Sequence, residues 1–200
     1  MNERQELSSA LSDFTGAPYV VLTDCCTHAL EVCLRLTKPK HITIPCNTYL
    51  SVVMTFVKLQ IPYSFTSHKW IGEYNLEQSN IWDSARLLKP RMYRKNSLQC
   101  LSFGHTKPVD NKRGGAILLD NHEQYMALEK MCYDGRDLSI TPWETQKKFN
   151  LGFHYNMPLE HAQNIKKLLD DYIQVGNFEP VFQSYPDCSK IKIKDSFDKV

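Results

Sequence analysis

Helical and strand patterns alternate along the first third of the chain, and this order restricts the fold more than any other feature of the sequence. Apolar residues recur at helical spacing in three segments, and each is followed by a short β-prone run. The helical segments are residues 3–14, 23–36 and 50–59, and the β-prone runs are residues 19–22, 41–45 and 61–65. Because parallel strands need a crossover helix between them, this alternation predicts a parallel sheet covered by helices. Ligands of such sheets bind at the carboxyl ends of the strands, where the turns with Thr27 and Tyr49 lie.

The rest of the chain continues the same pattern less regularly. We expect a loop over residues 66–79, a short strand over 80–83, two strands within 101–119, helices over 121–133 and 157–175, and an irregular segment over 137–151. The alternation of isoleucine and lysine over residues 191–194 predicts an edge strand.

Composition bounds the class of protein. A chain of 200 residues with 42% hydrophobic content is enough for one domain, or one domain with a small appendage. A formal charge of +2 favours neither bulk nucleic-acid binding nor a membrane surface. The seven cysteines include no CxxC pair, which is typical of reduced thiols, and no signal peptide or membrane-spanning apolar run is recognisable. We therefore expect a soluble cytoplasmic protein whose partners are set by individual sites.

Residues 101–115, LSFGHTKPVDNKRGG, place Lys107 in a short polar turn between two β-prone runs. A lysine at the edge of a core loses hydration, which lowers the pKa of its amine and makes the amine nucleophilic. A turn lysine taken alone is more often a solvated surface charge. The interpretation of Lys107 therefore depends on the residues that surround it in the fold.

Two other turns carry polar groups suited to a ligand. The turn before the helix in residues 23–36 should present the backbone amides of Cys26, Thr27 and His28, a suitable site for an anion. Asp24 or Thr27 can instead be an ordinary helix cap. Asp83 ends the short strand over 80–83, where its carboxylate can pair with a cationic ring nitrogen or cap a following helix.

Several other chemistries find little support. The basic segment over residues 89–96 could meet phosphate groups, but a surface loop with ordinary solvated charges is the safer interpretation. The sequence contains no GxxxxGK[ST] phosphate-binding loop and no G-x-S-x-G elbow. Cys25, Cys26 and His28 lack the spacing and the second ligand pair of a zinc site, so we expect no metal.

Six short segments, in this order, resemble the DegT/DnrJ/EryC1/StrS family of sugar aminotransferases. The segments are DCCTHALEVCL, IPCNTYLSVV, IWDSA, SFGHTKPVDNKRGG, DGRD and GFHYNMPLEHAQNI, and the resemblance spans about residues 5–175. It implies a pyridoxal 5'-phosphate (PLP) transferase of fold type I, with a three-layer α/β/α architecture and a mostly parallel sheet. It also implies a shortened cofactor-binding domain over residues 1–156, followed by a long helix and a reduced C-terminal segment over 157–200.

The resemblance assigns roles to individual residues. Lys107 would form a Schiff base with the cofactor and, as a free amine, shuttle the proton to and from the substrate carbon. Asp83 would keep the pyridinium nitrogen protonated, and Tyr49 would stack on the ring. Thr27 and Ser102 would bind the phosphate together with the amides at Cys26 and His28.

Asn156 matches a family position that reaches the phosphate of a neighbouring subunit, which implies a homodimer with shared active sites. The implied reaction moves an amino group from glutamate or glutamine to a keto sugar attached to a nucleotide.

The sequence departs from the family pattern in three respects. Arg86 replaces a glutamine that follows the aspartate, Lys112 and Arg113 replace a glycine and a glutamate, and family members are much longer. Two alternatives therefore remain open: a non-catalytic remnant that serves as a binding or partner subunit, and a PLP enzyme of altered reaction type, such as a dehydratase or a transferase acting on a modified nucleotide.

Overall fold

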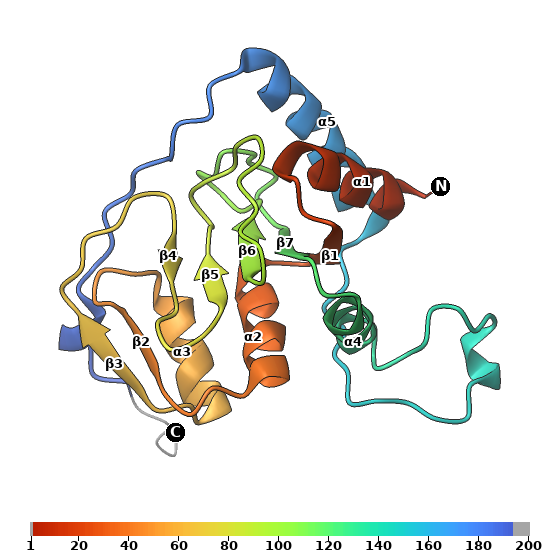
Figure 1. Ribbon diagram of the computed structural model, residues 1–200, viewed down its shortest axis with the longest axis horizontal. Helices are drawn as coiled ribbons and strands as arrows, with labels where there is room; N and C mark the ends of the chain where they lie inside the picture. The colour runs from red at the N-terminus through yellow and green to blue at the C-terminus, as the bar shows by residue number, and fades with distance from the viewer. Residues whose placement is uncertain (1, 194–200) are drawn as a thin grey trace, which may run out of the picture.

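A computed structural model describes residues 2–193 of the chain (Figure 1). Its main sheet has the strand order β1-β7-β6-β5-β4. These strands are β1 Tyr19–Thr23, β4 Tyr74–Asn75, β5 Ile81–Asp83, β6 Leu98–Ser102 and β7 Gly115–Leu119. A separate parallel pair joins β2 Ile42–Pro45 to β3 Tyr63–Thr66.

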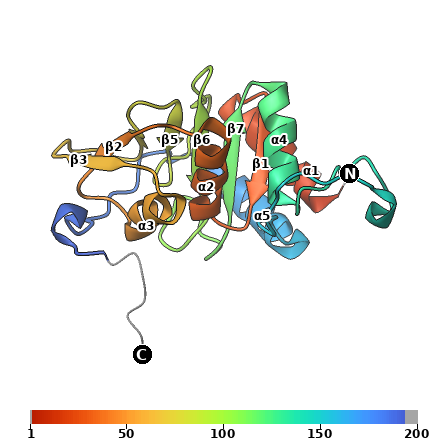
Figure 2. The ribbon, with the colours of Figure 1, turned by 90° about the horizontal axis from the view of Figure 1, so that it is seen from below.

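Helices cover both faces of the main sheet. On one face lie α2 Cys26–Thr37, α3 Leu50–Leu59 and α4 His122–Cys132, and on the other lie α1 Glu3–Thr15 and α5 Leu159–Val175 (Figures 1 and 2). Successive strand residues point to opposite faces, so the apolar runs of β1 and β7 supply both cores. Val21 and Ile117 pack with the α2 side, whereas Val20 and Leu118 pack with the α1 side. The expected three-layer α/β/α fold is confirmed.

The pairing within the sheet is more mixed than the alternation of elements predicts. Strands β1, β5 and β6 share one direction, but β7 lies antiparallel between β1 and β6. Strand β4 pairs antiparallel with β5 and falls in the segment expected to be a loop. Two residues are too few to show a strand periodicity, which is why the sequence did not indicate β4.

Helix boundaries follow local capping rules. Asn2 and Gln5 form a capping box at the start of α1, and Gly16 ends that helix at a φ of 79°. The expected capping of α2 by Asp24 or Thr27 is wrong, because its N-cap residue is Cys25 and no side chain caps it. The Asp24 carboxylate bonds to His28 and Arg113, while the Thr27 hydroxyl bonds to Ser51, so neither is free to cap.

The segment after α5 crosses the molecule toward β2 and β3 (Figure 1). The Val181 amide donates to the carbonyl of Arg86 at 3.0 Å, and the Cys188 amide donates to the carbonyl of Cys46 at 2.8 Å. A short helical turn, Cys188–Lys190, buries Cys188. Residues 191–193 form no strand, contrary to expectation, and Lys194 lies outside the described residues. Among residues 2–193, no helix is long and apolar enough to cross a membrane.

Candidate active site

A cavity of about 460 Å³ opens where β5 and β6 end and α2 begins. Six of the predicted site residues line it: Cys26, Thr27, Tyr49, Asp83, Ser102 and Lys107. They come from separate segments of the chain, and the sheet topology brings them together. This is the strand edge at which a ligand site is expected in an α/β fold.

Asp83 lies at the buried end of β5, with 5% of its surface exposed. Its Oδ1 accepts a hydrogen bond from the Ala85 amide at 3.0 Å, and its Oδ2 accepts one from the Tyr74 hydroxyl at 3.0 Å. Burial raises the pKa of Asp83, although the Ala85 amide, the charge of Lys107 and the Tyr74 hydroxyl oppose this. No helix follows β5 directly, so Asp83 is not a helix cap. Its carboxylate is fixed and partly dehydrated, as pairing with a buried cationic group requires.

Lys107 lies in the turn after β6, in the same cavity. Burial lowers the pKa of its amine, and the positive charge of Arg86 lowers it further, while Asp83 and Cys26 oppose the shift. A larger fraction of this amine is therefore neutral at a given pH than for an exposed lysine. The structure thus places Lys107 in the environment that favours a nucleophilic amine.

The start of α2 forms one wall of the cavity. Its first helical hydrogen bond runs from the Ala29 amide to the Cys25 carbonyl at 3.1 Å, so the amides of Cys26, Thr27 and His28 come before it. The Thr27 hydroxyl lies 2.8 Å from that of Ser51. Burial raises the pKa of the Cys26 thiol well above its ordinary value, which favours the neutral thiol in this wall.

Gly115 allows β7 to approach this turn. A Cβ atom at Gly115 would lie 2.5 Å from the carbonyl carbon of Cys25 and 2.6 Å from the amide nitrogen of Cys26. Any larger residue would therefore displace the start of α2. The second glycine of the KRGG sequence is thus required by close packing of two backbones at the turn predicted to bind an anion.

Aromatic side chains form the opposite side. Tyr49 is 59% exposed, and its ring meets that of Tyr185 edge-on at 6.1 Å. Tyr185 also stacks on Trp70 at 5.9 Å. Sequence reasoning missed Tyr185, Trp70 and Gln183, all of which line the cavity. Trp70 lies in an aperiodic segment and the other two in a tail without a motif, so no pattern marked them.

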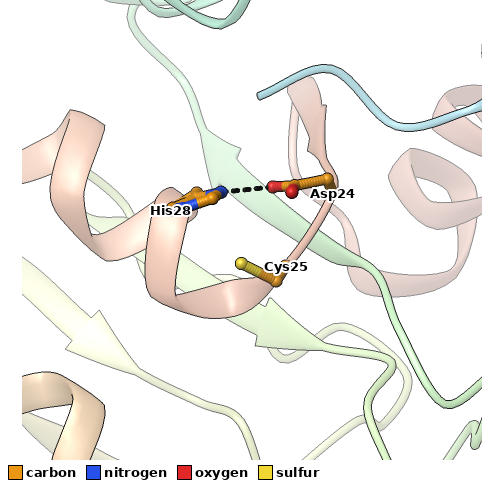
Figure 3. A group of neighbouring side chains, drawn as sticks. All are labelled: Asp24, Cys25 and His28. Carbon is orange, nitrogen blue, oxygen red and sulfur yellow. Dashed lines mark hydrogen bonds and ion pairs between the residues drawn. The ribbon is translucent and has the colours of Figure 1, made fainter. Parts of the chain in front are cut away.

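Two predicted residues lie outside this cavity lining. The His28 side chain points away from it: its Nδ1 lies 2.6 Å from Asp24 Oδ1 (Figure 3), and its ring stacks on Tyr155 at 3.6 Å. Only the His28 backbone amide faces the turn predicted to bind an anion. The Asn156 Oδ1 accepts a hydrogen bond from Arg4 at 3.1 Å, so this side chain is engaged within its own chain.

Asp24, Cys25 and His28 bring three groups of metal-ligating type within 4.8 Å of one another (Figure 3). Asp24 is also paired with Arg113 at 2.7 Å. Burial alone would lower the pKa of His28, but Asp24 and Cys25 raise it to about 9. Burial would raise the pKa of Asp24, yet the bonds to His28 and Arg113 lower it. The cluster is therefore a hydrogen-bonded ion network in which His28 is cationic at neutral pH.

The two basic residues that depart from the family pattern both have acidic partners. Arg113 pairs with Asp24 at 2.7 Å, and Lys112 pairs with Asp110 at 3.2 Å. Their positive charges are thus partly neutralised at the mouth of the cavity.

No protein-family model and no curated protein matches this sequence. Solved structures do match its fold. A 3-amino-5-hydroxybenzoic acid synthase superposes with a TM-score of 0.70 at 15% identity, over 86% of this chain and 56% of that one. The sugar aminotransferase CalS13 from Micromonospora echinospora gives 0.70 at 13% identity, over 86% and 61%. Helicobacter pylori PseC, an aminotransferase involved in the biosynthesis of pseudoaminic acid, gives 0.68 at 12% identity, over 87% and 59%.

These likenesses confirm the expected fold, and the chain spans 56–61% of the length of these three structures.

Proposed function

We propose that this chain binds pyridoxal 5'-phosphate in the cavity between β5, β6 and α2 and serves as a transaminase. The observation that carries the proposal is the presence of Asp83 and Lys107 in one cavity, where burial shifts the pKa of each toward its neutral form. Perturbed ionisable groups that converge in a cleft are typical of catalytic sites. The fold shared with aminotransferase structures supports the same conclusion.

The residues present suit this cofactor. The open amides at the start of α2, the close approach at Gly115 and the hydroxyls of Thr27 and Ser102 suit a phosphate group. The Asp83 carboxylate suits a protonated ring nitrogen, and Tyr49 can contact a ring at the mouth of the cavity. A volume of about 460 Å³ falls within the range of small-molecule sites, which is roughly 300–1,000 Å³.

The chemistry would be divided between cofactor and protein. When bound, the cofactor withdraws the electrons released when a proton leaves the carbon that carries the amino group. Asp83 would hold a proton on the ring nitrogen, and Lys107 would attach to the cofactor and later move the proton at the substrate carbon. The cavity walls and the C-terminal tail would limit access of water to the amine.

For the substrates, we propose glutamate or glutamine as the donor and a keto sugar, linked to a nucleotide, as the acceptor. Two of the structural neighbours are described as sugar aminotransferases. One of them is described in its PMP form, the form that carries pyridoxamine 5'-phosphate. A homodimer in the cytoplasm, with Asn156 near the partner's site, completes the proposal.

A second candidate is a binding or partner subunit without turnover. The observation in its favour is length, because the chain spans only 56–61% of the three solved structures described above. Such a subunit would retain the cofactor site without turnover of a substrate.

Spectroscopy separates the two functions. Purified protein mixed with the cofactor should develop the absorbance band of lysine-bound cofactor near the visible edge, and Lys107→Ala should abolish it. Added glutamate or glutamine should then convert the band to the spectrum of the aminated cofactor. A stable band that resists every amino donor would favour the binding subunit, and the absence of any band would overturn both.

A further inference from the structure

Arg86 is the largest of the fully buried side chains, with 2% of its surface exposed. It lies three residues after Asp83, in the turn that leaves β5. Burying a guanidinium is unfavourable unless its N–H donors are hydrogen-bonded and its charge interacts favourably with neighbouring groups. The contacts of Arg86 therefore indicate what the residue does.

One side of the guanidinium holds the turn that carries Lys107. Arg86 Nη1 donates to the Thr106 carbonyl at 2.6 Å and lies 3.3 Å from the Thr106 hydroxyl. Thr106 has a φ of 62°, a left-handed conformation that is strained for a β-branched residue. Arg86 thus stabilises a strained residue directly before Lys107.

The other side of Arg86 holds the C-terminal tail. Its Nη2 donates to Gln183 Oε1, and its backbone carbonyl accepts from the Val181 amide at 3.0 Å. The Tyr185 ring lies 5.9 Å from the guanidinium. We call residues 181–185 the C-terminal strap, because it is tied to Arg86 and places Gln183 and Tyr185 in the cavity wall.

We propose that Arg86 is a positioning residue for Lys107, which it serves by clamping the Lys107 turn to the C-terminal strap. The strap then closes the cavity beside the amine, in a chain shorter than the aminotransferases that share its fold. The inference deepens the proposed function, on which its catalytic meaning rests. The clamp itself is a property of the chain without cofactor.

The clamp also acts through charge. Arg86 is one of the groups that lower the pKa of Lys107, second to burial, which the strap helps to maintain. Arg86 Nε is buried and has no acceptor among residues 2–193, so its charge is incompletely neutralised by hydrogen bonds. The other titratable or charged groups facing Lys107 or sharing its cavity are Cys25, Cys26, Tyr49, Asp83, His105, Lys112, Arg113 and Tyr185. Among the hydrogen bonds of residues 2–193, none made by these groups joins the turn to the strap as those of Arg86 do.

Competitive acetylation tests the proposal without cofactor. The full chain is treated with limiting acetic anhydride over a range of pH, and peptide mass spectrometry gives the midpoint pH of each lysine. Exposed Lys69 and Lys89 are internal references. We expect a lower midpoint for Lys107 than for the references. Arg86→Gln should raise this midpoint by about one pH unit or more, because losing a nearby positive charge and losing burial both raise the pKa of the Lys107 amine.

Two further variants separate charge from tethering. Arg86→Lys keeps a positive charge without the planar fork, so it should retain part of the lowered midpoint. Gln183→Ala leaves Arg86 intact but unties the strap, so it should raise the Lys107 midpoint by less and speed chymotryptic cleavage at Phe182. Lys95→Gln removes an exposed charge away from the clamp and should change neither value.

The proposal is overturned if folded Arg86→Gln and Gln183→Ala both leave the Lys107 midpoint at the wild-type value. If Arg86→Gln does not fold, the proposal is overturned when Arg86→Lys and Gln183→Ala both leave the Lys107 midpoint at the wild-type value. Because no cofactor is present, these results stand apart from the absorbance test. If the variants shift the Lys107 midpoint but the protein forms no cofactor band, the proposed function is refuted and the clamp is supported.

Discussion

Tyr74 donates a 3.0 Å hydrogen bond to the carboxylate of Asp83, directly across the β4–β5 pair. The Tyr74 hydroxyl also lies 2.6 Å from that of Thr48, so one buried phenol joins the end of β5 to the turn before α3. The Ala85 amide holds the other carboxylate oxygen, so the two hydrogen bonds together fix the orientation of the Asp83 side chain. Asp83 is thus held by two partners, one from β4 and one from the turn after β5.

Tyr74→Phe should destabilise the protein and loosen Asp83. The change removes a hydrogen bond to a buried carboxylate and leaves the Thr48 hydroxyl without that partner, at a cost of about 1–3 kcal/mol in the free energy of unfolding. Urea denaturation measures this value. Tyr172→Phe is a matched control, since the Tyr172 hydroxyl donates to the backbone carbonyl of Leu88 and Tyr172 does not line the cavity. An equal or smaller loss in Tyr74→Phe would contradict the role of Tyr74.

The Asp24–His28 pair should make stability depend on pH. The pKa of His28 is raised from 6.5 to about 9 in the folded chain, so the native state binds the proton more tightly than the unfolded state. The stabilisation is complete below pH 6.5 and is lost as the pH rises through about 9. Allowing for solvent screening, we expect the free energy of unfolding to fall by about 1–2 kcal/mol across this window.

Urea denaturation at pH 6 and pH 9.5 measures the effect, and His28→Asn should remove the part due to this residue. The same fall in stability in the variant would show that other groups cause it.

Gly115→Ala should disrupt the start of α2. Its Cβ would meet backbone atoms of Cys25 and Cys26 at 2.5–2.7 Å, which no side-chain movement can relieve. We expect a loss of about 1–3 kcal/mol in stability and a weaker affinity for PLP, measured by denaturation and by absorbance titration. At Gly176, an added Cβ meets nothing within 4 Å, so Gly176→Ala should cost only the strain of its φ of 70° and leave the affinity unchanged. Equal affinities in both variants would contradict the assigned role.

Arg113→Ala should change stability little, because Arg113 is a partly exposed ion-pair partner. We expect a loss of about 0–1 kcal/mol, as is usual for surface pairs. The pKa of Asp24 should rise when this partner is removed, since the Arg113 bond lowers it. Carboxylate titration by NMR measures the shift, and an unchanged Asp24 pKa would contradict the pairing.

Local patterns predicted most of the fold. The periodicity of residues 50–59 matches α3, and Gly16 and Gly176 are the residues at which α1 and α5 end. The alternation of elements could not show that β7 runs antiparallel between β1 and β6, because strand direction depends on tertiary pairing. Strand β4 was missed because it has only two residues.

The residues of the candidate site that lie in turns after strands were predictable from the sequence, whereas those contributed by the C-terminal tail were not. Asp83 and Lys107 follow β5 and β6, so the topology of the sheet brings them together. Tyr185 reaches the cavity from a segment without periodicity, through contacts with Trp70 and Arg86 that depend on the complete fold. Arg86 stood out in the sequence only as a departure from a pattern, whereas the structure shows both of its partners.

The central claim is that Lys107 is the residue that attaches to PLP. The most direct measurement is to incubate the protein with the cofactor, reduce the mixture with borohydride and map the labelled lysine by peptide mass spectrometry. We predict stoichiometric labelling of Lys107, loss of that label in Lys107→Ala, and strong reduction of it in Asp83→Ala. Labelling spread over exposed lysines such as Lys69 and Lys89, with Lys107 unmodified, would contradict the claim.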